Sequence, residues 1–166
     1  MTTPIIIIVI SFFLDGILSN FLDYMLNDLS LFTPYFTLIS LIAIYPFFIK
    51  ENNKYYILAA ILGFLYDLFY TNLFLTNAIF FFLISYFVSI IERKIELNLI
   101  TNLLLLAFML MIYHLIFALT LFIFNVVPIN ITNIIYLISH SLILNLIYGE
   151  ILFLLCKYLP KRRHLN

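Results

Sequence analysis

Charge is the scarcest feature of this sequence. Only 10% of its 166 residues are charged, whereas 66% are hydrophobic, and the mean hydropathy is +1.19. A soluble domain of this length needs much more polar surface to cover its core, and a chain this apolar is not intrinsically disordered. The formal net charge of zero gives no sign of nucleic-acid binding. The composition therefore indicates a protein that lies in a lipid bilayer.

Cysteine, tryptophan and catalytic motifs are also scarce or missing. The single cysteine, Cys156, cannot form a disulfide within the chain. Without tryptophan, the aromatic belts at the membrane interfaces must come from the 12 tyrosines and 19 phenylalanines. The sequence has no HExxH, CxxC, GxGxxG or GxSxG motif and no Walker lysine. We therefore expect no catalytic residue, no metal site and no cofactor.

The apolar residues fall into six segments that approach the length of a membrane-spanning helix, which takes about 20 residues to cross ~30 Å. We therefore expect an all-α, polytopic membrane protein with six transmembrane helices in a single domain over residues 1–166. Segments 34–49 and 55–70 are the shortest and could instead form a re-entrant pair. The six expected spans are residues 4–22, 34–49, 55–70, 73–91, 97–124 and 134–156.

The basic residues predict how these spans cross the membrane. All eight lie in three places, and six crossings put these places on one face of the bilayer. Basic residues mark the cytoplasmic side of short loops, so both termini should lie in the cytoplasm. A re-entrant pair would bury Lys50 and Lys54 or put them on the wrong face, which favours six crossings. The three places hold Lys50 and Lys54; Arg93 and Lys94; and Lys157, Lys161, Arg162 and Arg163.

Five ionisable side chains lie inside the expected spans, where such groups are costly and usually face the interior of a bundle or a cavity. At a rise of 1.5 Å per residue, Asp15, Asp67 and His140 come at comparable depths in the outer half of the membrane. His114 also falls in the outer half. Glu150 lies near the cytoplasmic end of its span, and we interpret it as an interfacial group near the Lys157 side chain.

Polar side chains follow three of the spans at helical spacing, so each set lies on one helix face. One interpretation is an outward-opening pocket or a groove that binds a partner. The alternative is that these groups join helices through hydrogen bonds, each worth ~0.6–2 kcal/mol. The three sets are Ser11, Asp15 and Ser19; Gly63, Tyr66, Asp67 and Tyr70; and Ser141, Asn145 and Tyr148.

Asp67 is the most informative of these groups. An unpaired, ionised carboxylate inside the bilayer would cost several kcal/mol. It therefore stays protonated, pairs with His114 or His140, or accepts hydrogen bonds from a partner. We expect Asp67 to face the outward-opening interior together with Asp15.

Two further features of the spans concern packing and proton transfer. We interpret Gly16 and Gly63 as positions of close helix packing. Intramembrane Asp and His residues can relay protons, so a proton-coupled transporter is an alternative function. Neither an inverted repeat nor a pair of Gly/Pro-broken helices supports it.

Residues 63–72, with the sequence GFLYDLFYTN, resemble the most recognisable segment of the MreD family of rod shape-determining membrane proteins. The segments Leu14-Asp15-Gly16 and Pro34–Leu38 support the resemblance, as do the length, the expected span count and the placement of charge. The chain departs from the family at residues 75–78, where Leu75 precedes Thr76 and Asn77 and the family often has a glycine before the asparagine.

This resemblance implies a protein of the bacterial cell membrane that regulates cell-wall elongation and has no catalytic activity of its own. The implied partners are a bitopic MreC-like protein, and through it a peptidoglycan glycosyltransferase and a class B penicillin-binding protein. The family is similar in architecture to the S components of energy-coupling-factor vitamin transporters, and a substrate-binding S component is the alternative function. An S component typically has alanine-rich docking faces, which this alanine-poor chain lacks. The expected partner- or pocket-binding residues are Asp15, Gly16, Pro34, Gly63, Tyr66, Asp67, Tyr70, His114 and His140.

Overall fold

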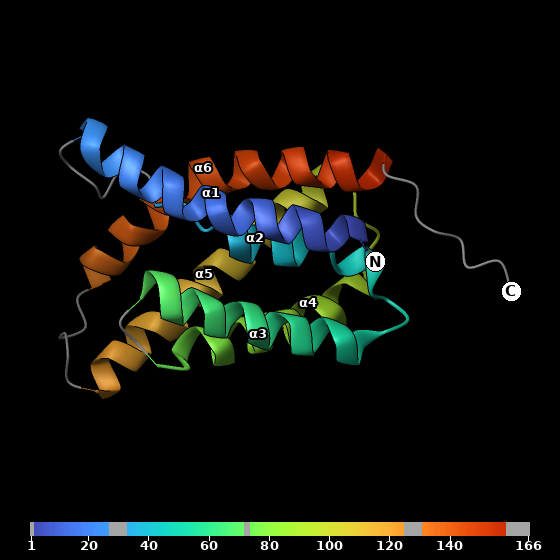
Figure 1. The fold of residues 1–166 in the computed structure, drawn as a ribbon, viewed down its shortest axis with the longest axis horizontal. Helices are drawn as coiled ribbons and strands as arrows, with labels where there is room; N and C mark the ends of the chain where they lie inside the picture. The colour runs from blue at the N-terminus through green and yellow to red at the C-terminus, as the bar shows by residue number, and fades with distance from the viewer. Residues whose placement is uncertain (1, 27–32, 72–73, 125–130, 159–166) are drawn as a thin grey trace, which may run out of the picture.

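A computed structural model describes residues 2–26, 33–71, 74–124 and 131–158 of the chain. Within these residues the protein is all-α, as the sequence predicts (Figure 1). The loop regions 27–32, 72–73 and 125–130 and the basic residues Lys161, Arg162 and Arg163 lie outside the described residues. The helices are α1 (Thr2–Leu26), α2 (Phe36–Ala43), α3 (Asn52–Tyr70), α4 (Thr76–Glu92), α5 (Leu99–Ile123) and α6 (Ile131–Tyr158), with a 3-10 turn, η2 (Tyr45–Phe47), after α2.

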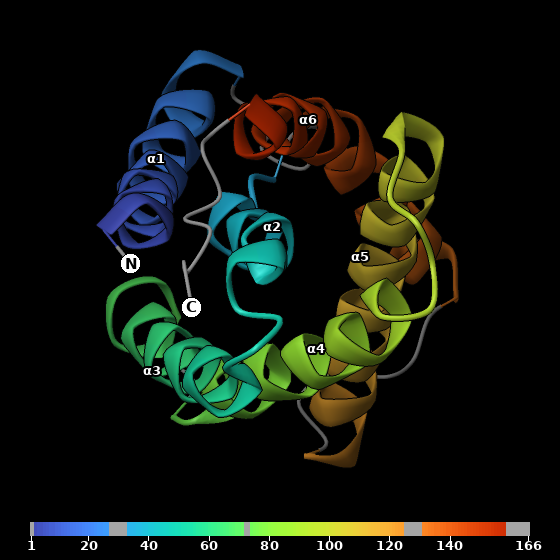
Figure 2. The same cartoon turned by 90° about the vertical axis from the view of Figure 1, so that its right-hand side faces the viewer.

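The helix α2 lies at the centre of the bundle. Figure 2 shows it surrounded by α1, α3, α4, α5 and α6. All eight of its residues are buried, so this helix contacts protein on every side and has no lipid-facing stripe. Its sequence, FTLISLIA, is accordingly apolar around the whole helix, apart from two small hydroxyl residues.

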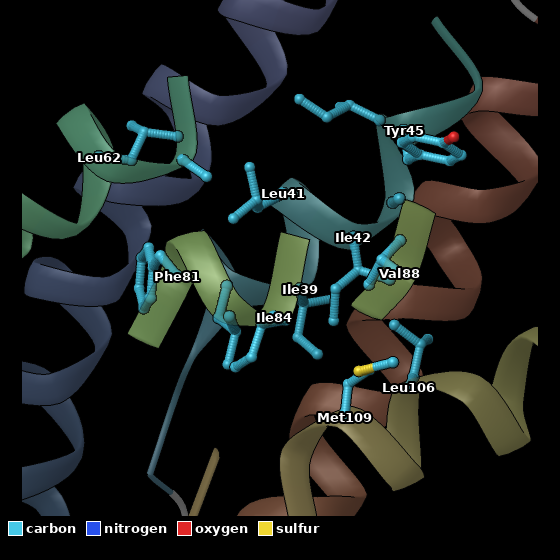
Figure 3. Packing of buried hydrophobic residues seen from close by; sticks show 14 of the residues in the cluster. Ile39, Leu41, Ile42, Tyr45, Leu62, Phe81, Ile84, Val88, Leu106 and Met109 are labelled. Carbon is cyan, nitrogen blue, oxygen red and sulfur yellow. The ribbon is translucent and has the colours of Figure 1, made fainter. Parts of the chain in front are cut away.

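The side chains of α2 form the middle of the core. Figure 3 shows Ile39 and Ile42 of α2 beside Ile84 and Val88 of α4. Met109 of α5 joins the same cluster, and all five side chains are fully buried. Inside a bilayer the lipid tails are as apolar as these residues, so close packing rather than the hydrophobic effect stabilises the cluster.

The second expected span, residues 34–49, is shorter in the structure than the sequence predicts. At a rise of 1.5 Å per residue, the eight residues of α2 extend for only about 12 Å. The helix gives way to the 3-10 turn at Tyr45-Pro46-Phe47, because proline has no N–H to donate and disfavours helical geometry in the residue before it. The helix α2 by itself therefore does not reach across a ~30 Å hydrocarbon layer.

By length and composition, three of the described helices can cross a membrane. These segments are Thr3–Phe21, Leu99–Ile123 and Ile134–Tyr158, and two shorter apolar helices cover Phe36–Phe47 and Thr76–Glu92. The outer faces of the long helices carry exposed apolar residues, such as Phe13 and Ile17 of α1 at 61% and 63% exposure. In water such faces would aggregate, whereas in a bilayer they meet lipid. The chain is therefore a multi-pass membrane protein.

The described segments that carry basic residues lie at one end of the bundle. The α2–α3 connection, the α4–α5 connection and the end of α6 all lie at the end of the molecule that holds the N-terminus (Figure 1). The Arg93 Nε donates to the Tyr45 hydroxyl at 3.2 Å, and that hydroxyl donates to the Asn52 side chain at 3.3 Å. The two loops that carry basic residues between spans are therefore neighbours in space.

Leu75, which precedes α4, has a left-handed backbone conformation with φ of 60°. Glycine adopts this conformation without a steric penalty, whereas a residue with a Cβ atom is strained in it. Leu75 is therefore a strained position at the start of α4, where a glycine would be tolerated without strain.

Candidate functional site

Asp15 of α1 binds the N-terminus of the central helix α2. Its carboxylate accepts hydrogen bonds from the backbone N–H of Phe36 at 2.6 Å and of Thr37 at 2.8 Å, and from the Thr37 hydroxyl at 2.5 Å. The first N–H groups of a helix have no partner within the helix, and they carry partial positive charge. The side chain is only 1% exposed. A buried carboxylate is therefore stabilised here by a helix terminus instead of a basic residue.

Asp67 of α3 makes the same kind of contact with α4. Its carboxylate accepts hydrogen bonds from the backbone N–H groups of Asn77 at 2.8 Å and Ala78 at 3.3 Å, and from the Asn77 side-chain amide at 2.7 Å. The Thr71 hydroxyl donates a fourth bond at 2.8 Å. The Tyr113 hydroxyl of α5 donates to the Asn77 side chain at 2.8 Å, so three helices meet around this carboxylate.

The two carboxylates thus follow one pattern. In each case an aspartate in the second half of a long helix accepts hydrogen bonds from the first N–H groups of the next helix along the chain. Of the alternatives for Asp67, the structure has the one in which it accepts hydrogen bonds, and the donors belong to this chain itself.

Neither histidine contacts Asp67. The His114 Nε2 lies 2.8 Å from the Ser141 hydroxyl, which joins α5 to α6. The His140 Nδ1 lies 2.7 Å from the carbonyl oxygen of Tyr136 on its own helix. The histidines therefore form no pair with a carboxylate in the part of the chain that the structure describes.

A cavity of about 460 Å³ lies beside Asp15. It is bounded by α1, by the segment 33–35 before α2, and by the C-terminal halves of α3 and α5. Five of the nine expected site residues line it, namely Asp15, Gly16, Pro34, Tyr66 and Tyr70. The other four, Gly63, Asp67, His114 and His140, are not among its lining residues. Asp67 is buried in the bundle, but its carboxylate points at the N-terminus of α4 and not into the cavity beside Asp15.

The two glycines among the expected site residues differ in what they contact. A Cβ atom at Gly63 would lie 2.6 Å from the Ala78 Cα and closer still to the Asn77 carbonyl group. Gly63 thus lets the backbone of α4 approach α3 closely enough for Asp67 to reach it. A Cβ atom at Gly16 would meet the side chain of Tyr70, 2.7 Å from its hydroxyl oxygen.

Two asparagines that the sequence does not single out as site residues connect the helices around these carboxylates. Asn77 bonds to Asp67 and Tyr113, and Asn145 bonds to the segment before α2. The Asn145 Oδ1 accepts from the Tyr35 N–H at 2.7 Å, and its Nδ2 donates to the Thr33 carbonyl at 2.8 Å. The helix α6 thereby fixes the segment that leads into α2. The place of Asn145 in a polar set four residues after Ser141 is the signal that could have identified it.

Glu150 lies away from the cavity and binds α5. Its Oε1 accepts from the Asn102 side-chain amide at 2.9 Å, while its buried Oε2 has no hydrogen-bond partner among the described residues. The described residues contain no ion pair between Glu150 and Lys157, so the interpretation as an interfacial group beside that lysine is not supported. They also contain no cluster of three or more His, Cys, Asp or Glu residues that could hold a metal ion.

Comparison with known proteins identifies one family. The family model described as rod shape-determining protein MreD matches residues 2–162, which is nearly the whole chain. No curated protein and no solved structure gives a significant match.

Proposed function

This chain belongs to the MreD family of rod shape-determining proteins, and we propose on that premise that it is a scaffold of the cell-wall elongation machinery in the bacterial cytoplasmic membrane. As a family member it is part of the cell-shape machinery and is not an enzyme. The proposed partner is a bitopic MreC-like protein, through which it regulates an elongation glycosyltransferase and a class B penicillin-binding protein. The family match over residues 2–162 is the observation that carries this proposal.

The use of the interior polar groups supports a scaffold over a transporter. A proton relay needs carboxylates and histidines that exchange protons along a path. Here Asp15 and Asp67 are each occupied by the N-terminus of a helix, and His114 is bonded to Ser141. These contacts fix helices against each other, which suits a protein that presents a stable surface to its partners.

Family membership also favours the shape-determining role over a vitamin-binding S component. The architectural similarity to S components stays a prediction. The feature to compare with a structure of an S component is the central helix α2, which five other helices surround.

Depletion of the protein tests the proposed function. Rod-shaped cells should become round, and the tagged full-length protein should co-purify with a bitopic, coiled-coil membrane protein. Re-expression of the intact chain during depletion should restore rods, which controls for polar effects of the depletion. Co-purification with a pair of ABC-type ATPases and a bound vitamin would replace this proposal by the S-component function.

For the topology we propose six crossings with both termini in the cytoplasm. Reporter fusions after Asn52, Ile95 and Asn166 should then report the cytoplasm, because each follows an even number of crossings. Fusions after Ser30, Thr71 and Asn130 should report the outside. A cytoplasmic signal from the Asn130 fusion would contradict six crossings.

A further inference from the structure

The cavity beside Asp15 has the chemistry of a binding site for a cation. Its lining contains one carboxylate and no lysine, arginine or histidine. Six of its thirteen lining residues are aromatic, and they surround the space from three sides of the bundle: Tyr35, Tyr66, Phe69, Tyr70, Tyr113 and Phe117. Aromatic faces attract cations, most strongly where water is excluded, and aromatic cages are a common means of recognising organic ammonium groups.

The carboxylate of Asp15 keeps capacity for a further contact. A carboxylate has about four lone-pair sites, and three hydrogen bonds from Phe36 and Thr37 occupy Asp15. These donors are neutral groups, and Asp15 forms no ion pair among the described residues. A cation in the cavity would offset a buried charge that the helix terminus stabilises only in part.

Two hydroxyl groups at the cavity are also unused. The Tyr70 and Tyr113 hydroxyls donate to Phe12 and Asn77. By contrast, the hydroxyls of Tyr35 and Tyr66 make no hydrogen bond within the described residues, and neither oxygen is a buried unpaired atom, so both are accessible from the cavity that these residues line. A hydroxyl both donates and accepts hydrogen bonds, so a ligand in the cavity can bond to both groups.

We propose that this cavity binds a small organic ammonium compound, with the cationic group over the tyrosine rings near Asp15. A volume of about 460 Å³ lies within the range of small-molecule sites, roughly 300–1,000 Å³. An anion is disfavoured by the carboxylate, and a wholly apolar ligand would leave the two hydroxyls unpaired. The same ammonium chemistry occurs in water-soluble amines and in the headgroups of zwitterionic lipids.

Calorimetric titration of the purified full-length protein in maltoside micelles tests this proposal. The probes are choline and 3,3-dimethyl-1-butanol, which has nearly the same shape without the charge. Choline should bind saturably and at least about tenfold more tightly than the alcohol, since a desolvated cation–aromatic contact supplies on the order of 1–2 kcal/mol. Equal binding of the two probes, or no binding of choline, would overturn the proposal.

Variants place the binding in the cavity. Tyr66→Phe should weaken choline binding about threefold or more, because it removes only an unpaired hydroxyl and leaves the packing intact. Asp15→Asn should abolish it. Tyr86→Phe, at a half-exposed tyrosine of α4 outside the cavity, should leave it unchanged. Unchanged binding in folded Tyr66→Phe and Asp15→Asn proteins would overturn the proposal, and Tyr66→Phe alone decides if Asp15→Asn does not fold.

Competition identifies the natural source of the ammonium group. If a lipid headgroup is the ligand, phosphatidylethanolamine added to the micelles should displace choline, whereas phosphatidylglycerol should not. If the ligand is a water-soluble amine, neither lipid should displace it. Displacement by phosphatidylglycerol alone would contradict selectivity for a cation and overturn the proposal.

Discussion

Replacing Asp67 with alanine is expected to destabilise the protein severely and to impair rod-shape maintenance. The change removes four hydrogen bonds at once and leaves the N–H groups of Asn77 and Ala78 without an acceptor in the bundle interior. Loss of a helix cap costs about 1 kcal/mol, and each buried donor left unpaired costs about 1–3 kcal/mol. We therefore expect a loss of about 3 kcal/mol or more, measured as a lower melting temperature of the purified protein in detergent.

Glu150→Ala provides the matched control for Asp67→Ala. Glu150 is also a carboxylate inside a long helix, but it accepts a single hydrogen bond and has one oxygen without a partner. Its removal should cost clearly less stability and should leave cells more rod-shaped at equal membrane levels. Asp67→Asn should fall between the two, because the amide oxygen can still accept while the amide nitrogen cannot. An unchanged melting temperature and normal rod shape with Asp67→Ala would show that the contact between Asp67 and α4 does not stabilise the protein.

Gly63→Ala is expected to have the second large effect. The added methyl group would overlap the backbone of Asn77 and Ala78, and a backbone cannot rotate away as a side chain can. Overpacking of this kind typically costs 1–3 kcal/mol, and we expect a value near the upper end, about 3 kcal/mol. Pushing α4 away from α3 would also lengthen the hydrogen bonds of Asp67, since Gly63 is one helical turn before it.

The control for Gly63→Ala is Gly16→Ala. There the nearest atoms belong to the outer end of the Tyr70 side chain, which can move at the cost of its hydrogen bond to the Phe12 carbonyl. The Gly16→Ala protein should therefore accumulate in the membrane at higher levels than the Gly63→Ala protein. Equal levels of the two variants, each close to those of the unmodified chain, would contradict the close contact between α3 and α4.

Much of the fold follows from the apolar segments of the sequence. The long segments 97–124 and 134–156 correspond to α5 and α6 within a few residues, because a continuous apolar stretch bounded by polar loops specifies a helix in a bilayer. The length of α2 could not be predicted from the sequence, which indicates a helix over residues 34–49 where the structure has one only over Phe36–Ala43. A short apolar segment does not reveal whether lipid or other helices surround it, and only the packed structure places residues 36–43 inside the bundle.

The candidate site was predicted less completely. Helical spacing predicts that Asp15, Tyr66 and Tyr70 lie on inward faces, and these three residues line one cavity together with Gly16, which was expected only as a position of close packing. Spacing could not assign the partner of Asp67, because a carboxylate that caps another helix depends on how two helices meet in space. Depth alone makes His114 and His140 suitable partners of Asp67, but their bonds to Ser141 and Tyr136 are set by side-chain direction and not by depth.

Asp15 and Asp67 each hold the N-terminus of the following helix. Amide NMR spectra of the isotope-labelled protein in micelles test it most directly, because an N–H bonded to a carboxylate gives a shifted, slowly exchanging proton signal. Such signals are expected for the Thr37 and Asn77 amides, which donate to Asp15 and Asp67. Asp15→Asn should change the Thr37 signal and leave that of Asn77 in place, and Asp67→Asn should do the reverse. Fast-exchanging Thr37 and Asn77 amides that neither substitution affects would show that the two aspartates do not bind these helix N-termini.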